Sequence, residues 1–111
     1  YKNPENVGVL INASIRAKEN NPLCGDEIQI ELKLDRNKVK EAKFIGKGCV
    51  ISQASADLLL SYIKNKTLNE IKKITNDDLL ELIGIKLTPT RLNCALLSLS
   101  TLEKGINEYE K

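Results

Sequence analysis

Apolar and polar residues alternate over the first half of the chain. The alternation is clearest over residues 27–34 and is also present over residues 13–18, and a period of two predicts strands with one buried face. A less regular alternation over residues 39–45 predicts a third strand. The polar stretches 19–22 and 35–38 predict a turn and a hairpin connection. Three short strands with short links predict an antiparallel meander.

Two regions carry weaker patterns. In the third strand, strict alternation puts Lys40, Ala42 and Phe44 on one side and leaves four residues for the other, namely Val39, Glu41, Lys43 and Ile45. Ahead of the strands, Pro4 followed by Gly8 predicts one short helical turn that ends at the glycine.

The pattern changes to a helical period after Gly48. Apolar residues then recur at intervals of three and four, at Ile51, Ala54, Leu58, Leu59 and Ile63. We expect Ser52 to cap this helix, because its hydroxyl can accept from an unpaired backbone N–H. Lys64 and Lys66 carry positive charge at the end where the helix dipole favours it.

Two short helices are predicted next. Thr67 and the glutamate three residues later form a capping box, which opens a helix that ends near Ile74. The polar run 75–78 opens another helix over residues 79–83. Gly84 is typical of a helix end and stops it.

A long helix is predicted to close the chain. Residues 85–90 form a linker that contains Pro89, and helical spacing begins near Arg91, with apolar residues at Leu92, Ala95, Leu96, Leu99, Leu102 and Ile106. Strands followed by helices predict an α+β fold. We expect a three-stranded antiparallel sheet with the helices packed on one face, and residues 1–111 forming a single domain.

Composition and charge narrow the function classes. The 111 residues include 41% hydrophobic but only 4% aromatic residues, so the core must be mainly aliphatic. A net charge of +2, from 17 basic and 15 acidic residues, argues against nucleic-acid and membrane-surface partners. No apolar run approaches the length of a membrane span. The chain contains no Met, so we expect the natural start to precede Tyr1.

Three cysteines and one carboxylate are the candidate chemistry. Cys24, Cys49 and Cys94 are the only cysteines, and histidine is absent, which removes Cys–His nucleophilic catalysis and the usual imidazole ligand. Three thiolates and Asp26 suffice for a tetrahedral metal site. The alternative is a set of buried thiols acting as small hydrophobic groups. An odd number of cysteines without a secretory signal favours a reducing compartment: the cytoplasm, or an organelle.

The surroundings of the cysteines favour the shared site. Cys49 precedes a predicted helix and Cys94 is expected in the first turn of the last one, where backbone N–H groups and the helix dipole favour thiolate. Gly25 permits unusual backbone angles between Cys24 and Asp26. No close C-x-x-C pair occurs, so the fold itself must assemble such a site. Its one hard oxygen ligand could exchange, which suits an occupant that is delivered and released.

Five segments in order resemble the IscU/NifU/SufU family of iron–sulfur cluster scaffolds. They are Y-K-N-P-E-N-V-G at residues 1–8, N-P-L-C-G-D at 21–26, G-K-G-C-V-I-S-Q-A-S at 46–55, K-T-L at 66–68 and R-L-N-C-A at 91–95. The resemblance covers nearly the whole chain. It implies an α+β scaffold or carrier protein rather than an enzyme.

The resemblance also implies a ligand set, cargo and partners. Such proteins receive persulfide sulfur from a cysteine desulfurase, combine it with iron into a [2Fe–2S] cluster and deliver the cluster to apo-proteins. The implied ligands are Cys24, Cys49, Cys94 and Asp26, with Cys94 as the first sulfur acceptor. Zinc commonly occupies this site in isolated members of the family.

The chain departs from the IscU type at two places. Asn93 stands where that type has histidine before the third cysteine, so Asp26 must carry more of the fourth ligand position. Residues 87–91 read L-T-P-T-R instead of L-P-P-V-K, which puts an Hsp70 chaperone partner in doubt. Residues 46–55 are closer to the SufU type, although that type's insertion before the third cysteine is lacking. The alternative function is therefore a zinc-dependent sulfurtransferase partner that relays persulfide sulfur.

Overall fold

A three-stranded antiparallel sheet forms one layer of the molecule in a computed structural model. The structure describes residues 6–21, 25–48, 50–84 and 89–110. The strands are β1 (Ile15–Asn21), β2 (Asp26–Asp35) and β3 (Lys38–Lys47), and they lie in the order β1-β2-β3. Both neighbouring pairs are antiparallel, which confirms the predicted meander.

The hairpin predicted over residues 35–38 joins β2 and β3, and its turn has only two residues between the strands. Asp35 pairs with Lys38, and the two residues between them, Arg36 and Asn37, have φ values of 54° and 66°. Positive φ at both central positions is the turn geometry whose twist matches that of the flanking strands. The local sequence therefore fixes the register of the central strand.

β1 extends further than its alternation predicted. The strand runs to Asn21, so the turn predicted over residues 19–22 is wrong for the described residues 19–21, which pair with residues 26–28 of β2. The asparagines favour a turn locally, but the backbone hydrogen bonds offered by β2 outweigh that preference.

The face assignment in β3 is also wrong at its start. Val39 is fully buried together with Ala42 and Phe44, while Lys40 is exposed. The register shifts between Lys33 and Leu34 of the partner strand, and such an irregularity changes which side chains share a face. Strict alternation cannot anticipate it.

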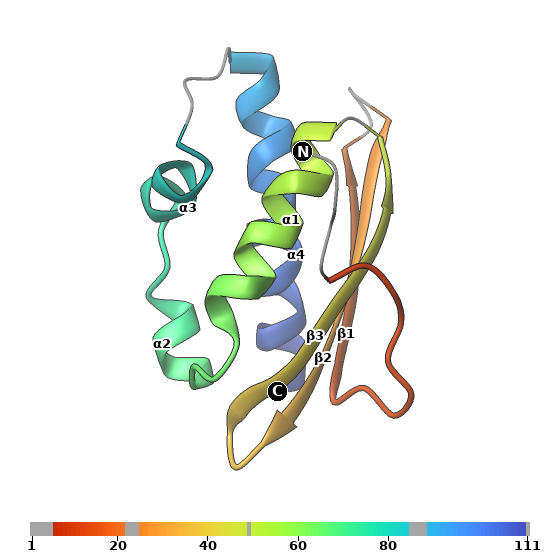
Figure 1. The fold of residues 1–111 in the computed structure, drawn as a ribbon, viewed down its shortest axis with the longest axis vertical. Helices are drawn as coiled ribbons and strands as arrows, with labels where there is room; N and C mark the ends of the chain where they lie inside the picture. The colour runs from red at the N-terminus through yellow and green to blue at the C-terminus, as the bar shows by residue number, and fades with distance from the viewer. Residues whose placement is uncertain (1–5, 22–24, 49, 85–88, 111) are drawn as a thin grey trace.

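Four helices cover one face of the sheet, as Figure 1 shows. They are α1 (Val50–Ile63), α2 (Leu68–Lys72), α3 (Asn76–Ile83) and α4 (Pro89–Tyr109). α1 and the long C-terminal α4 lie against the sheet, and α2 and α3 lie beyond them. Buried side chains from the sheet and all four helices form one core cluster. The predicted α+β architecture is confirmed.

The short helices begin and end as their sequences predict. Thr67 and Thr75 each accept from the backbone N–H three residues later, and the acidic side chain at that position accepts in return from the threonine N–H. Gly84 ends α3 in a left-handed conformation. Ser52 is not a cap, because α1 begins at Val50 and the serine is buried inside its first turn.

α4 begins two residues earlier than predicted. Pro89, assigned to a linker from the sequence, is the first helical residue, a position where proline loses no intrahelical hydrogen bond. The linker prediction is therefore wrong at residues 89 and 90, and its remainder, 85–88, lies outside the described residues. In the part of the chain that is described, no helix is both long and apolar enough to cross a membrane.

The N-terminal segment lies along β3 rather than forming a helical turn. Asn6 accepts through its backbone carbonyl from Phe44, and Gly8 donates to the Phe44 carbonyl. The Asn6 side chain also donates to Asp57 and Ser61 of α1. Residues 6–8 contradict the predicted turn, and Pro4 lies outside the described residues.

Candidate functional site

Two of the four predicted ligands, Asp26 and Cys94, lie among the described residues. Cys24 and Cys49 do not, so the predicted set of four is not seen together. Among the residues that the structure describes, no three Cys, His, Asp or Glu side chains group closely enough to hold a metal ion. The position of the site is therefore indicated by Asp26 and Cys94 and by the chain neighbours of Cys24 and Cys49.

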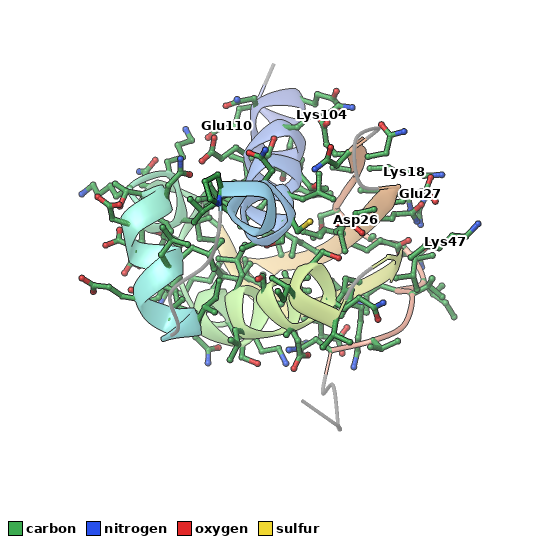
Figure 2. All side chains as sticks on the ribbon, turned by 90° about the horizontal axis from the view of Figure 1, so that it is seen from above. Lys18, Asp26, Glu27, Lys47, Lys104 and Glu110 are labelled. Atoms are coloured by element: carbon green, nitrogen blue, oxygen red, sulfur yellow. The ribbon has the colours of Figure 1, made fainter. Side chains whose placement is uncertain are left out.

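Asp26 is a buried carboxylate at the end of the sheet. It is the first residue of β2 and pairs with Asn21, the last residue of β1. Because side chains alternate along a strand, Asp26 extends the apolar row of Ile28 and Ile30 toward the helices. Its exposure is only 1%. In Figure 2, Asp26 lies nearer to the helices than the labelled Glu27 and Lys47.

The segment before Cys49 reaches this carboxylate. Gly48 lies so close that a Cβ built on it would stand 1.9 Å from Oδ1 of Asp26. Gly25, the neighbour of Cys24, donates through its N–H to the Asn21 carbonyl at 2.9 Å. The described neighbours of Cys24 and Cys49 thus meet around Asp26, and α1 begins at Val50, directly after Cys49. The expectation of a helix start there is confirmed.

Cys94 lies on the stripe of α4 that faces the sheet. One face of α4 carries four residues at intervals of three and four, namely Cys94, Ser98, Thr101 and Gly105. The side chains of Cys94, Ser98 and Thr101 are buried. A Cβ built on Gly105 would stand 2.9 Å from Ile15 and 3.0 Å from Ala17 of β1. This stripe is therefore the one that packs against β1.

α4 and β1 run in opposite directions, as Figure 1 shows, so the start of the helix lies level with the end of the strand. The helix rises about 16 Å between Gly105 and Cys94 at ~1.5 Å per residue. A strand covers about the same length in roughly five residues, which leads from the middle of the contact with Ile15 and Ala17 to Asn21, the partner of Asp26. Cys94 therefore comes to the level of Asp26.

A groove lined from both elements supports this placement. Its volume is about 320 Å³, and its lining includes Asn20 and Asn21 from the end of β1 with Asn93 and Leu97 from α4. The residue before Cys94 and the partner of Asp26 thus border one space. Asp26, Cys94 and the neighbours of the other two cysteines share one end of the molecule.

The helix dipole of α4 favours a thiolate at Cys94 less than the sequence predicted. α4 begins at Pro89, so Cys94 is in the second turn rather than the first, and the effect of the dipole fades beyond the first turn. The thiol is 2% exposed. Close packing, rather than the helix end, sets its surroundings.

A buried carboxylate on the open face of the sheet was not anticipated. Glu31 accepts from the Leu10 backbone N–H at 2.8 Å, from Arg16 at 3.1 Å and from Gln29 at 2.8 Å. Burial alone would raise the pKa of Glu31, but these hydrogen bonds outweigh it and hold the pKa below its ordinary value. Alternation placed Glu31 on a solvent face, and the loop that covers it gave no sequence signal.

The chain is similar in sequence to known proteins over nearly its whole length. A SufU of Bacillus subtilis (strain 168), described as a zinc-dependent sulfurtransferase, is 42% identical over 127 aligned residues, covering 99% of this chain and 86% of the relative. An iron–sulfur cluster assembly scaffold protein IscU of Haemophilus influenzae is 32% identical, covering 99% of this chain and 89% of the relative.

A solved structure shares the fold over nearly the whole chain. It comes from Fervidobacterium islandicum AW-1 and is a candidate iron–sulfur cluster assembly scaffold for the SUF system, with a TM-score of 0.79, 29% identity, and coverage of 95% of this chain and 89% of that one. The family model described as the NifU-like N-terminal domain matches residues 1–111. The resemblance seen in the sequence is confirmed: the chain belongs to the NifU-like N-terminal domain family.

Proposed function

We propose that the chain is an iron–sulfur cluster assembly scaffold, with residues 1–111 acting as one domain. It receives sulfur from a cysteine desulfurase, combines it with iron and delivers a [2Fe–2S] cluster to apo-proteins. The family match over all 111 residues carries this proposal. The meeting of Asp26, Gly25, Gly48 and the Cys94 stripe at one end of the fold supports it.

The proposed ligands are Cys24, Cys49, Cys94 and Asp26. Soft thiolates suit both iron–sulfur clusters and zinc. Asp26 lies beside Gly48, the neighbour of Cys49, and is two residues from Cys24, so its carboxylate fits a fourth ligand to three thiolates. Its harder oxygen makes it the ligand that leaves first when the cluster is transferred.

Cys94 is the proposed first sulfur acceptor. Its thiolate attacks the outer sulfur of the persulfide on the desulfurase, a new S–S bond forms, and the desulfurase cysteine leaves as thiolate. Because Cys94 is buried, this transfer requires the end of the molecule near the groove to open toward the donor.

A zinc-dependent sulfurtransferase partner is the second candidate. The SufU of Bacillus subtilis is 42% identical, against 32% for the IscU of Haemophilus influenzae, and Asn93 replaces the histidine of the IscU type. In this function zinc stays bound and one cysteine relays sulfur. The 127-residue alignment with SufU is longer than this chain, so the relative has residues that this chain lacks, as the missing insertion predicts.

Anaerobic reconstitution separates the two functions. The purified protein is incubated with ferrous iron, cysteine, a cysteine desulfurase and a thiol reductant, which supplies the electrons that convert persulfide sulfur to sulfide, and its visible spectrum and metal content are measured. The scaffold function predicts a [2Fe–2S] spectrum in the wild type and its loss in Cys49→Ala. Zinc that persists while only persulfide accumulates on the protein would favour the sulfurtransferase function.

An exposed variant on β3 provides the matched control. Lys40→Ala changes a side chain that is exposed on a strand away from the site, so it should reconstitute like the wild type. Equal loss of the spectrum in Lys40→Ala and Cys49→Ala would show that reconstitution reports general stability and not ligation.

A further inference from the structure

Gly48 makes an unusually close approach to the Asp26 side chain. A Cβ built on Gly48 would stand 1.9 Å from Oδ1, 2.7 Å from Cγ and 2.9 Å from Cα of Asp26. The φ of Gly48 is 122°, in the region that side-chain-bearing residues rarely adopt. Both observations require glycine here, and the first does so because of Asp26, whose carboxylate makes the shortest contacts.

Gly48 is also held in place from other directions. Gln53, one turn into α1, donates through Nε2 to the Gly48 carbonyl at 3.3 Å. Two residues earlier, a Cβ on Gly46 would stand 2.6 Å from the Glu27 carbonyl oxygen. Two glycines therefore let the end of β3 lie flat against the start of β2.

This packing explains why Asp26 is buried although it is the first residue of the central strand. Gly48 is itself exposed, while Asp26 is 1% exposed. The backbone at Gly48 is therefore the layer between the carboxylate and solvent on that side. A short side chain enclosed in this way keeps one rotamer, because the alternatives would collide with the backbone.

We infer that Gly48 is a positioning residue for Asp26. Its backbone covers the carboxylate and fixes the direction in which the oxygen atoms point, so that release of Asp26 from a metal requires the end of β3 to move. The part concerning metal rests on the proposed function; the covering of the carboxylate does not.

Chemical labelling of carboxyl groups in the metal-free protein tests directly whether the Gly48 backbone covers Asp26. Carbodiimide modifies exposed carboxyl groups, and peptide mass spectrometry measures the extent at Asp26. The wild type should show little modification, and Gly48→Ala should show a severalfold increase. Gly84→Ala is the control, because Gly84 also has a positive φ of 75° but its nearest contact would be the Glu81 carbonyl at 4.0 Å. Equal labelling in the wild type and Gly48→Ala would overturn the inference.

Zinc affinity, measured by chelator competition, tests the effect on ligation. Gly48→Ala should weaken zinc binding about tenfold, the usual lower range for a residue that orients a ligand, and Gly84→Ala should not. In an Asp26→Ala background, Gly48→Ala should cause no further loss. The same loss in both backgrounds would show that Gly48 acts independently of Asp26, and would overturn the inference.

A milder variant remains usable if Gly48→Ala does not fold. Gln53→Ala removes only the hydrogen bond to the Gly48 carbonyl and changes a partly exposed helix residue. It should raise Asp26 labelling above that of Asn69→Ala, an exposed control on α2, and unchanged labelling would overturn the inference. A wild-type protein that binds neither zinc nor cluster would contradict the proposed function, while the labelling result would still decide the role of Gly48.

Discussion

At the scale of single residues, the buried carboxylates Asp26 and Glu31 lie on opposite faces of the same strand, β2. Glu31 is satisfied by three donors on the open face of the sheet. Asp26 stands at the end of an apolar row beneath the backbone of Gly48. The first arrangement stabilises the charge of Glu31 on the open face, whereas the second places Asp26 on the helix-facing side, beside the segment that leads to Cys49.

Replacing Asp26 by alanine should slow cluster transfer. If the carboxylate is the ligand that leaves first, its loss removes the route by which an acceptor enters the coordination sphere. We expect the cluster on Asp26→Ala to persist severalfold longer in the presence of an apo-ferredoxin, followed by the visible spectrum under anaerobic conditions. Faster transfer than in the wild type would show that Asp26 retains the cluster instead.

Replacing Glu31 by glutamine should reduce stability mainly at neutral pH. The pKa of Glu31 lies below its ordinary value of 4.5, so its contribution is present above that value and is lost as the pH falls through the lower, folded-state pKa. We expect a loss of about 1 kcal/mol at pH 7, typical of the net contribution of one hydrogen bond, measured by urea unfolding.

The pH dependence supplies the control for Glu31. The difference between the wild type and Glu31→Gln should shrink steadily below pH 4.5. Glu41→Gln, an exposed position on β3, should show no such difference at neutral pH. A constant difference across the whole range would mean that shape, and not charge, is responsible.

At the scale of elements, the contact between α4 and β1 sets the position of Cys94. Gly105 has no room for a side chain against Ile15 and Ala17, so a larger residue must push the helix away from the strand. Gly105→Leu should destabilise the protein by about 2 kcal/mol, within the range for overpacking, and lower its melting temperature. It should also weaken zinc binding, because the displacement carries Cys94 away from the sheet.

An exposed position on the same helix distinguishes overpacking from a change in hydrophobicity. Asn107→Leu adds the same side chain on the solvent side of α4. It should leave both the melting temperature and zinc affinity close to those of the wild type. Similar losses in the two variants would contradict the proposed role of the Gly105 contact.

The sequence predicted the elements whose signals are local. The capping box at Thr67, the helix opened by residues 75–78 and the glycine stop at Gly84 all rest on neighbouring residues, and all are confirmed. The strand β2 is confirmed too, although Glu31 departs from its alternation. The failures have a tertiary cause. The turn preference at Asn20 yielded to pairing with β2, and Val39 changed face at a register irregularity.

The sequence indicated the candidate ligands of the site but not the residues that position them. Asp26 and Cys94 stand out by residue type and by family resemblance. The close approach of Gly48 and the Gln53 hydrogen bond depend on how β3 enters α1, which no local pattern encodes. The ligand set of four itself stays a prediction, because Cys24 and Cys49 lie outside the described residues.

At the scale of the whole molecule, the proposed ligands join the two layers. Asp26 belongs to the sheet, Cys94 to the last helix, and Gly48 leads from the sheet into the first helix. A metal held by such ligands links segments that are far apart in the sequence. If these residues are the ligands, metal binding is expected to stabilise the folded state directly.

Zinc should raise the melting temperature of the metal-free protein, because an ion that binds only the folded state stabilises it. Free zinc at 100 times its dissociation constant contributes about 2.7 kcal/mol, which is several degrees for a domain of this size. Differential scanning calorimetry before and after zinc addition measures the shift. Cys94→Ser should lose most of it, because replacing a buried thiolate ligand breaks the link between α4 and the sheet. If Cys94→Ser kept the full shift while Lys40→Ala behaved like the wild type, zinc would be bound without α4, and the assembly of one site from both layers would be wrong.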